Sequence, residues 1–184
     1  MSMGGRLEKI RLLVLDVDGT MTDGGIYLDD NGRESKRFSV RDGAGILLAR
    51  QAGIETVILT GRESGCVTKR AQELGIRYVF QNVKEKGRFL GRFLEEKEIP
   101  GKVVAYLGDD FNDLAAMKLA GVTACPKDAA ESVRRACDYV LKSRGGRGAV
   151  REFVEMILRK RDMLETCAEQ LWGEKDEQVK GQTV

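Results

Sequence analysis

The sequence contains no histidine among its 184 residues. This absence excludes Ser-His-Asp and Cys-His catalysis and any phosphohistidine intermediate, because each requires an imidazole. Neither a disulfide framework nor a zinc site is expected, because the four cysteines are far apart in the sequence, without a Cys-x-x-Cys pair. These cysteines are Cys66, Cys125, Cys137 and Cys167. If the chain is an enzyme, its proton transfers must therefore rely on carboxylates.

The sequence also lacks long apolar runs and an excess of charge of one sign. No run approaches the roughly 18 residues that a membrane helix requires, and residues 1–11 contain no apolar signal core. With 31 basic and 29 acidic residues, the formal net charge of +2 gives no indication of binding to nucleic acid or to an anionic membrane. We therefore expect a cytoplasmic protein with one well-packed domain.

Short apolar runs alternate with helix-like segments along most of the chain. Buried strands are predicted at residues 12–15, 56–59, 78–80, 103–107, 122–125 and 139–141. Helices are predicted at residues 44–52, 64–74 and 112–120, each followed by a glycine suited to a helix C-cap. This alternation predicts an α/β fold with a doubly wound, Rossmann-like parallel sheet, in which ligands bind beyond the carboxyl ends of the strands.

Two carboxylates follow the first predicted strand. Asp16 and Asp18 are two residues apart, so their side chains point the same way from an extended chain, and Gly19 permits a tight turn around a ligand. Carboxylates this close repel each other unless a cation lies between them, and Mg²⁺, which prefers carboxylate and phosphate oxygens, is the expected cation. The spacing indicates a phosphoryl-transfer site, and an ordinary acidic turn is the alternative interpretation.

Three later strand ends add polar groups that would reach the same edge of the sheet. Thr60-Gly61-Arg62 follows the second strand, Lys86 follows the third, and Asp109-Asp110 follows the fourth. Asp113 comes three residues after Asp110, and Lys84 is an alternative to Lys86 as a phosphate ligand. A hydroxyl, an ammonium and further carboxylates at successive strand ends form a far more specific combination than any one of them.

In this order and spacing, the residues resemble the four motifs of the haloacid dehalogenase-like hydrolases. The matching residues are Asp16-x-Asp18, Thr60, Lys86 and Gly108-Asp109-Asp110-x-x-Asp113. Further segments resemble the 3-deoxy-D-manno-octulosonate 8-phosphate phosphatase branch of these hydrolases. They are Thr22-Asp23-Gly24, Val40-Arg41-Asp42-Gly43, Thr60-Gly61-Arg62 and residues 145–152, which begin with Gly-Gly-Arg-Gly. The resemblance covers roughly residues 10–158, most of the chain.

The resemblance implies a phosphatase that acts on a sugar phosphate in the pathway to lipopolysaccharide. Asp16 would attack phosphorus and become an aspartyl phosphate, which splits hydrolysis into two easier displacements. Asp18 would protonate the leaving alkoxide and then take a proton from the attacking water. Thr60 and Lys86 would bind the remaining phosphoryl oxygens as charge spreads over them.

The same resemblance implies a Mg²⁺ site and residues that support it. The carboxylates of Asp16 and Asp109 and the main-chain carbonyl of Asp18 would hold the ion. Asp113 would orient Lys86 or a metal-bound water, and Asp110 is a further supporting candidate behind the ligands.

Two other aspartates, Asp23 and Asp42, each precede a glycine. They are expected to be turn or cap residues rather than metal ligands.

Arginines are the candidates for binding the carboxylate of a 2-keto sugar acid. Arg62, Arg41 and Arg147 each offer a guanidinium for a bidentate pair, with Gly61 beside Arg62 in the expected substrate site. Arg41 and Arg147 could equally be surface or interface ion-pair residues.

Within the resemblance, phosphatases for the nine-carbon analogue tend to carry an acidic residue in place of Arg62 and a lysine in place of Glu73. Both positions favour the eight-carbon substrate, and the alternatives are another sugar phosphate, such as a nonulosonate 9-phosphate, or a non-catalytic assembly domain like those fused to cytidylyltransferases.

Residues 25–40 predict a β-hairpin with an Asn31-Gly32 turn, at the place where many relatives insert a cap domain. The hairpin is too small to be a cap, and the interval from Thr60 to Lys86 holds only one helix and one strand, so no cap domain is expected. An open site benefits from enclosure. The resemblance implies a homotetramer in which the hairpin and neighbouring subunits cover each pocket. The alternative is a monomer with a plain flap and a macromolecular substrate.

Apolar residues recur at helical spacing from Val150 to Trp172. We expect a phosphatase domain at residues 1–160 and, at residues 161–184, a C-terminal helix extension and polar tail. The apolar face of the extension would either mediate assembly or fold back over the sheet. Beyond Gly173 the polar composition predicts disorder.

Overall fold

Six parallel strands form the central sheet of the protein, whose computed structural model describes residues 4–173. In sheet order they are β5 (Tyr78–Phe80), β4 (Glu55–Leu59), β1 (Leu12–Leu15), β6 (Val104–Leu107), β7 (Val122–Cys125) and β8 (Tyr139–Val140). Each strand lies within one residue of its predicted bounds. The predicted doubly wound α/β fold is confirmed.

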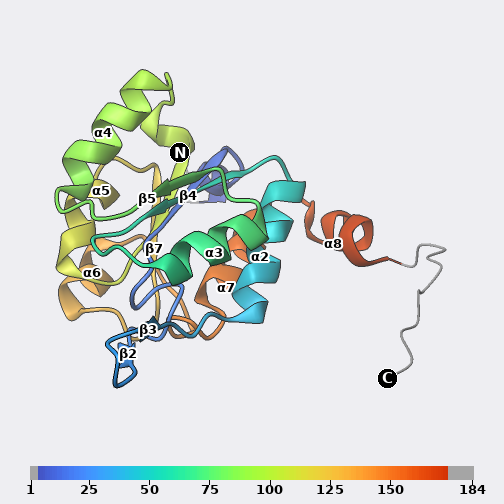
Figure 1. The fold of residues 1–184 in the computed structure, drawn as a ribbon. Coiled ribbons are helices and arrows are strands. Elements are labelled where there is room, and N and C mark those ends of the chain that lie inside the picture. The colour runs from blue at the N-terminus through green and yellow to red at the C-terminus, as the bar shows by residue number, and fades with distance from the viewer. Residues whose placement is uncertain (1–3, 174–184) are drawn as a thin grey trace, which may run out of the picture.

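Helices cover both faces of the sheet (Figure 1). One face carries α2 (Val40–Gln51), α3 (Gly65–Leu74) and α7 (Ala149–Lys160), and the other carries α4 (Lys86–Glu96), α5 (Leu114–Met117) and α6 (Glu131–Ala136). Successive side chains of β1 alternate between these layers: Leu13 and Leu15 pack into the core under α2 and α7, and Leu12 and Val14 pack into the core under α4. A strand buried on both faces must be apolar throughout, which explains the continuous apolar run.

The order of the strands creates a switch point beside β1. The chain runs from β1 outward through β4 to β5, and then crosses to β6 on the other side of β1. Leu15, the last residue of β1, pairs with Ile58 of β4 and with Leu107 of β6. The carboxyl ends of these three strands therefore meet where the strand order reverses, which is where open α/β sheets bind ligands.

The segment after β6 departs from the predicted helix 112–120. A short 3-10 turn, η2 (Phe111–Asp113), precedes α5, which ends at Met117. Asp110 and Asp113 form a reciprocal capping box around η2, so the side chains fix a tight turn in place of the expected first helical turn. Gly121 is not a C-cap, because its N–H donates to the carbonyls of Gly101 (2.7 Å) and Val104 (3.0 Å) as the chain enters β7.

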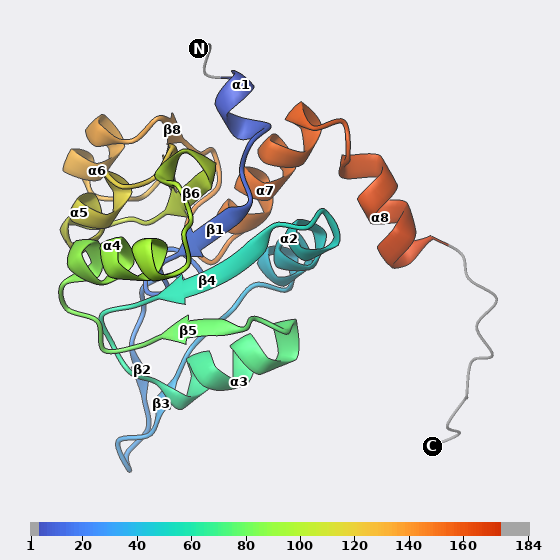
Figure 2. The same ribbon diagram turned by 90° about the horizontal axis from the view of Figure 1, so that it is seen from above.

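The predicted hairpin is present, formed by β2 (Tyr27–Leu28) and β3 (Glu34–Ser35). The two strands pair antiparallel, and Gly32 adopts a φ of +73° in the connecting loop. The hairpin reaches out from the body of the molecule (Figure 2). In the described chain, no other element lies between β1 and α2, so the hairpin is a flap and not a cap domain.

The C-terminal region forms two helices where the apolar periodicity indicated one continuous helix. The chain turns between α7 and α8 (Leu164–Trp172), where Asp162 adopts a φ of +52°. Leu164 and Cys167 are buried in the core shared with α2, and Gln51 Nε2 donates to Gln170 Oε1 at 2.8 Å. α8 therefore packs beside the end of α2 and leads away from the sheet (Figure 2).

Two further expectations concern the chain ends and membranes. The predicted boundary at residue 160 coincides with the end of α7, and the division of the chain into residues 1–160 and 161–184 stays a prediction. The predicted disordered tail lies outside the described residues. Within residues 4–173, no helix combines the length and the apolar character that are needed to cross a membrane.

Candidate active site

A pocket of about 310 Å³ opens at the carboxyl ends of the central strands. Its lining residues come from four loops: Asp16, Asp18, Thr60, Gly61, Arg62, Val83, Lys84, Asp110 and Asn112. The structure therefore brings the predicted carboxylate pair, hydroxyl and guanidinium to one pocket. Lys86, Asp109 and Asp113 lie beside these lining residues and contact Asp16 and Asp110.

The loop after β1 is shaped by Gly19, which has a φ of +90°. A Cβ atom at this position would lie 2.1 Å from Oδ2 of Asp109, so only glycine permits this approach. Thr20 Oγ1 donates a hydrogen bond of 3.1 Å to Asp109 Oδ1. On the other side of the loop, a Cβ atom on Gly145 would lie 1.8 Å from the Gly19 carbonyl oxygen. The Gly-Gly-Arg-Gly segment thus packs its backbone directly against the acidic loop.

Lys86 lies beneath Asp16 and is almost completely buried. It is the first residue of α4, and its Nζ lies 2.6 Å from Asp16 Oδ1 and 2.7 Å from Asp113 Oδ1. Burial acts to lower the pKa of Lys86, but the charges and hydrogen bonds of the two carboxylates outweigh it, so the pKa is raised and the ammonium stays charged. Lys84, the alternative ligand, lies at the pocket wall, where its Nζ donates to the Gly61 carbonyl at 2.5 Å.

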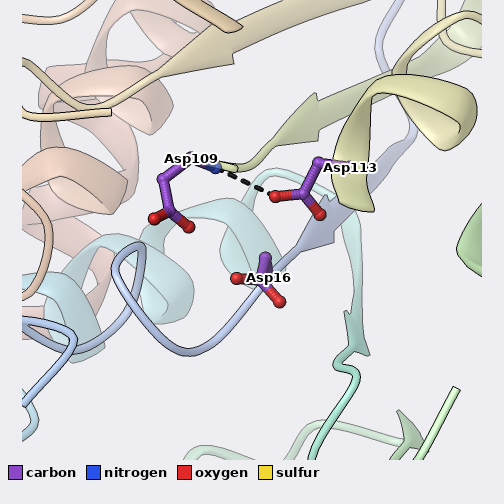
Figure 3. A group of neighbouring side chains, drawn as sticks. All are labelled: Asp16, Asp109 and Asp113. Carbon is purple, nitrogen blue, oxygen red and sulfur yellow. Dashed lines mark hydrogen bonds between the residues drawn. The ribbon is translucent and has the colours of Figure 1, made fainter. Parts of the chain in front are cut away.

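Asp113 is fully buried, and each of its carboxylate oxygens accepts two hydrogen bonds. Its Oδ1 accepts from Lys86 and from the Tyr106 hydroxyl (2.7 Å), and its Oδ2 accepts from the backbone N–H groups of Asp109 (3.0 Å) and Asp110 (3.3 Å). Figure 3 shows the bond from Asp109 N together with the three neighbouring carboxylates. Since both oxygens already have two donors, Asp113 orients Lys86 and the turn after β6 and is poorly placed to bind a cation as well.

Asp16, Asp109 and Asp113 form the acidic cluster of the site, with one carboxylate oxygen of each within 4.8 Å of the others (Figure 3). Burial, followed by the charge of Asp113, raises the pKa of Asp16 to about 6 despite the ammonium of Lys86. Burial, followed by the charges of Asp16 and Asp113, raises the pKa of Asp109 to about 8. The negative charge of the cluster thus exceeds what Lys86 neutralises, and a hard divalent cation between Asp16 and Asp109 fits this surplus and these oxygen donors.

The flap contributes an ion network that the sequence interpretation missed. The Nζ of Lys36, the residue directly after β3, contacts Asp18 Oδ1 and lies 3.3 Å from Glu34 Oε1, although the Lys36 side chain is only 1% exposed. Arg62 Nη2 lies 2.8 Å from Glu34 Oε1, and its Nε lies 3.8 Å from Asp18 Oδ2. Hydrogen bonds from Ser64 and Arg62, together with the nearby Lys36 charge, lower the pKa of Glu34 against the effect of burial. Glu34 and Lys36 are two residues apart, so their shared strand face was the available signal.

Two further residues of the site were missed. Tyr106 lies in β6 with its hydroxyl on Asp113, and burial raises its pKa well above the ordinary value. Asn112 lines the pocket from the turn after Asp110. A lone hydroxyl in an otherwise apolar strand, two residues before the acidic motif, was the signal for Tyr106, and the position of Asn112 inside that motif was the signal for Asn112.

The remaining predicted residues lie away from the pocket. Arg41, in the first turn of α2, and Arg147, in the glycine loop, are exposed and are not among the residues that line the pocket. Their roles in substrate binding stay predictions. Asp42 caps α7, since its carboxylate accepts from the backbone N–H groups of Gly148 (3.1 Å) and Arg151 (3.0 Å), and Asp23 accepts from Gly25 N (3.2 Å) in a turn. Both agree with the cap and turn interpretation.

The fold and the site define a hydrolase of the haloacid dehalogenase-like class. An acidic pair after β1, a threonine after β4, a buried lysine at the start of α4 and an acidic motif after β6 surround one pocket. The family model described as haloacid dehalogenase-like hydrolase matches residues 33–121.

Comparison with known proteins narrows this class. The chain is 42% identical to the 3-deoxy-D-manno-octulosonate 8-phosphate phosphatase KdsC of Escherichia coli (strain K12) over 153 residues, 83% of this chain and 81% of that relative. It belongs to the family of 3-deoxy-D-manno-octulosonate 8-phosphate phosphatases. A solved structure of the Moraxella catarrhalis phosphatase in complex with magnesium ion, phosphate ion and KDO superposes with a TM-score of 0.88 at 36% identity, covering 92% of this chain and 97% of that one. The cobalt-bound phosphatase of Haemophilus influenzae gives a TM-score of 0.84 at 36% identity, covering 91% of this chain and 99% of that one.

Proposed function

We propose that the protein is a Mg²⁺-dependent phosphatase that hydrolyses 3-deoxy-D-manno-octulosonate 8-phosphate to the free sugar acid and inorganic phosphate. The observation that carries this proposal is the convergence of Asp16, Lys86 and Asp109 beside a pocket that Thr60 also lines. The family supplies the substrate class, and the Moraxella relative was solved with magnesium, phosphate and KDO.

Asp16 is the proposed nucleophile. Lys86 binds its Oδ1 at 2.6 Å and fixes the side chain, which leaves Oδ2 to attack phosphorus and form the aspartyl phosphate. Lys86 also stabilises negative charge beside the reacting group, in a place where water is excluded. Asp113 positions Lys86 for both tasks.

Asp18 is the proposed general acid and base. It lines the same pocket as Asp16, and Lys36 of the flap holds its Oδ1. Asp18 gives a proton to the leaving oxygen in the first step and takes one from water in the second. Thr60, which lines the pocket from the loop after β4, offers a hydroxyl to a phosphoryl oxygen. Mg²⁺, held by Asp16, Asp109 and the Asp18 carbonyl, supplies positive charge that offsets the charges of the carboxylates and the phosphate.

Cations around the pocket mouth suit a sugar acid. Arg62 lines the pocket with Lys84, and Arg62 already binds a carboxylate, that of Glu34. An incoming substrate carboxylate would compete with Glu34 for the same guanidinium. A nonulosonate 9-phosphate is the second candidate substrate, and Arg62 favours the eight-carbon acid over it. Glu73, the other discriminating position, is exposed and paired with Arg70 at 2.8 Å, outside the pocket.

The free energy needed to bury the charged groups of the site argues against a purely structural role as an assembly domain. Burying Lys86 with two carboxylates desolvates three charges, and apolar residues of similar volume generally stabilise a core as well or better. A chain without catalytic function has no need of this arrangement.

We further propose a homotetramer in the cytoplasm, in which the flap and neighbouring subunits enclose each pocket. The flap carries three neighbouring apolar residues that are exposed in the single chain, namely Ile26 (55%), Tyr27 (47%) and Leu28 (65%). Large apolar side chains exposed close together on a small flap are a reason to expect a contact with a partner. Sedimentation at micromolar concentration tests the assembly, and a fully active monomer would contradict it. Cell fractionation tests the location.

The function is tested by measuring phosphate release from a panel of sugar phosphates: the eight-carbon keto acid phosphate, the nine-carbon analogue and simple hexose phosphates. We expect the eight-carbon substrate to give the highest kcat/KM, EDTA to abolish turnover and Mg²⁺ to restore it. Asp16→Asn is the control variant and should lose all activity while keeping its fold. Near-normal turnover by this variant would refute the nucleophile, and a preference for hexose phosphates would refute the substrate.

A further inference from the structure

Two of the cysteines meet outside the active site. Cys125 is the last residue of β7 and is fully buried, and Cys137 is the half-buried C-cap residue of α6. Their sulfur atoms lie 3.2 Å apart although the residues are 12 positions apart in the sequence. A disulfide has an S–S distance of about 2.05 Å, so the sulfurs need to approach by only about 1 Å to form one.

The backbone on both sides of the pair is fixed. Cys137 N–H donates to the Val133 carbonyl at 3.0 Å at the end of α6, and Leu141 N–H donates to the Cys125 carbonyl at 2.9 Å. In the sheet, Ala124 pairs with Tyr139 and Cys125 pairs with Val140. Since neither thiol can move far from the other, the two groups have a high effective concentration.

We propose that Cys125 and Cys137 form a reversible intramolecular disulfide by exchange with a small-molecule disulfide such as oxidised glutathione. The pair lies outside the catalytic pocket, because neither cysteine is among the residues that line it. The cysteines Cys66 and Cys167 lie in α3 and α8, on the other face of the sheet from α6, and provide natural controls.

The two thiols differ in a way that assigns the order of the steps. The hydrogen bond between the two thiols lowers the pKa of Cys137, while the same hydrogen bond and burial raise the pKa of Cys125. Cys137 is also the more exposed of the two. Cys137 is therefore the thiol that attacks the oxidant, and Cys125 is the one that resolves the mixed disulfide.

The exchange balances in two displacements. The Cys137 thiolate attacks one sulfur of oxidised glutathione, so that a Cys137–glutathione bond forms and one glutathione thiolate leaves. The Cys125 thiolate then attacks the Cys137 sulfur, and the second glutathione leaves as the protein disulfide forms. The protein loses two electrons and two protons, and oxidised glutathione gains them to become two thiols.

The disulfide would fasten a segment that supports the active site. Between the two cysteines, the Ala130 N–H donates to the Asp109 carbonyl at 2.8 Å, and Asp128 Oδ1 accepts from Gly145 N at 3.0 Å. Gly145 is the residue packed against the Gly19 carbonyl. The Cys125–Cys137 disulfide would also anchor β8, a strand of only two residues at the edge of the sheet.

The test uses the full chain in a Cys66→Ala/Cys167→Ala background, which retains only the proposed pair. The native protein is equilibrated with oxidised glutathione, alkylated, denatured and measured by intact mass and peptide mapping. We expect a species lighter by two hydrogens, with neither thiol alkylated and with the peptides of Cys125 and Cys137 linked, and dithiothreitol should restore both thiols. The wild-type chain, mapped in the same way, should show the same linked peptides, so the result does not depend on the folding of the variant.

Single substitutions separate the roles of the two thiols. Added to this background, Cys125→Ala should leave a stable mixed disulfide with glutathione on Cys137, because the resolving thiol is missing. Cys137→Ala should leave Cys125 unmodified. The proposal is overturned if both thiols of the pair remain open to alkylation, if glutathione accumulates on Cys137 while Cys125 is present, or if the disulfide links two chains.

Discussion

The site contains two ion clusters that use the same groups in different surroundings. In the floor cluster, Lys86 lies between Asp16 and Asp113, and the three side chains are between 0% and 7% exposed. In the flap cluster, Lys36 and Arg62 contact Asp18 and Glu34, and Arg62 is 48% exposed. The floor is built on the ends of β1 and β6 and on the start of α4, whereas the flap rests on two strands of two residues each.

The difference in burial separates a rigid part of the site, the floor, from an adaptable part, the flap. Charges in the floor cannot separate without leaving an unpaired buried charge, so their geometry is strongly fixed. In the flap, the Lys36 side chain is buried, but Asp18 (25%), Glu34 (17%) and Arg62 (48%) are open to water, where exchanging one partner for another costs little. We infer that the floor performs the steps common to phosphoryl transfer and that the flap adapts to the substrate.

The largest expected effect comes from breaking the floor. Lys86→Met should lower kcat by at least about 10³-fold, since it removes both the anchor of Asp16 and the charge next to the phosphate. It should also destabilise the fold by roughly 3–5 kcal/mol, because Asp16 and Asp113 are left buried without their cation. Steady-state kinetics and thermal unfolding in the presence of Mg²⁺ measure the two effects.

Lys84→Met is the matched control for this prediction. Lys84 lies at the pocket wall and donates to the Gly61 carbonyl, so its removal should leave the melting temperature nearly unchanged and lower kcat/KM by less than about tenfold, as expected for an exposed charge. If Lys84→Met inactivated the enzyme while Lys86→Met remained active, Lys84 and not Lys86 would be the phosphate ligand.

A smaller effect is expected from breaking the flap cluster. Lys36→Met should lower kcat/KM by about 10- to 100-fold, because Asp18 loses the group that holds it. It should lower the melting temperature by less than Lys86→Met does, because the carboxylates that lose their cation, Asp18 and Glu34, are 25% and 17% exposed and can be hydrated. Lys36→Arg should recover part of the loss, since it restores a cation to the same carboxylate. A loss of stability as large as that of Lys86→Met would remove the distinction between the two clusters.

The contrast between the clusters also explains what the sequence could predict. Strands buried on both faces are continuous apolar runs, so the ends of β1, β4 and β6, and with them Asp16, Thr60 and Asp109, could be located from the sequence. Lys36 could not, because its contact with Asp18 depends on how the flap folds over the sheet. The turn after β6 was missed since the Asp110 and Asp113 side chains cap a tight turn. The division of the C-terminal helical pattern into α7 and α8 was missed because apolar spacing continues across the break at Asp162.

The smallest effect, and the sharpest test of the difference, concerns pH and Mg²⁺. The pKa values of Asp16 and Asp109 are raised to about 6 and about 8, above the unfolded value of 3.8. Without the cation, the folded protein holds protons that the unfolded chain releases, so this contribution to stability is fully present below about pH 4 and is lost as the pH rises to about 8. The flap behaves in the opposite way, since the lowered pKa of Glu34 gives stability that is present above its unfolded pKa of 4.5 and is lost in acid.

Mg²⁺ competes with the protons of the floor, so its stabilising effect should increase with pH. At pH 8.5 and a concentration of 100 Kd, the ion should stabilise the fold by about 2.7 kcal/mol and raise the melting temperature by roughly 5–10 °C. At pH 6 and the same concentration, protonation of Asp109 alone should weaken binding about 100-fold and leave a shift of about 1–2 °C. Differential scanning fluorimetry at the two pH values measures both shifts, with Asp109→Asn as the control that should lose the response to Mg²⁺. Equal shifts at pH 6 and pH 8.5 would mean that Asp16 and Asp109 are already ionised at pH 6 without the cation, and the raised pKa values of the floor carboxylates would then be wrong.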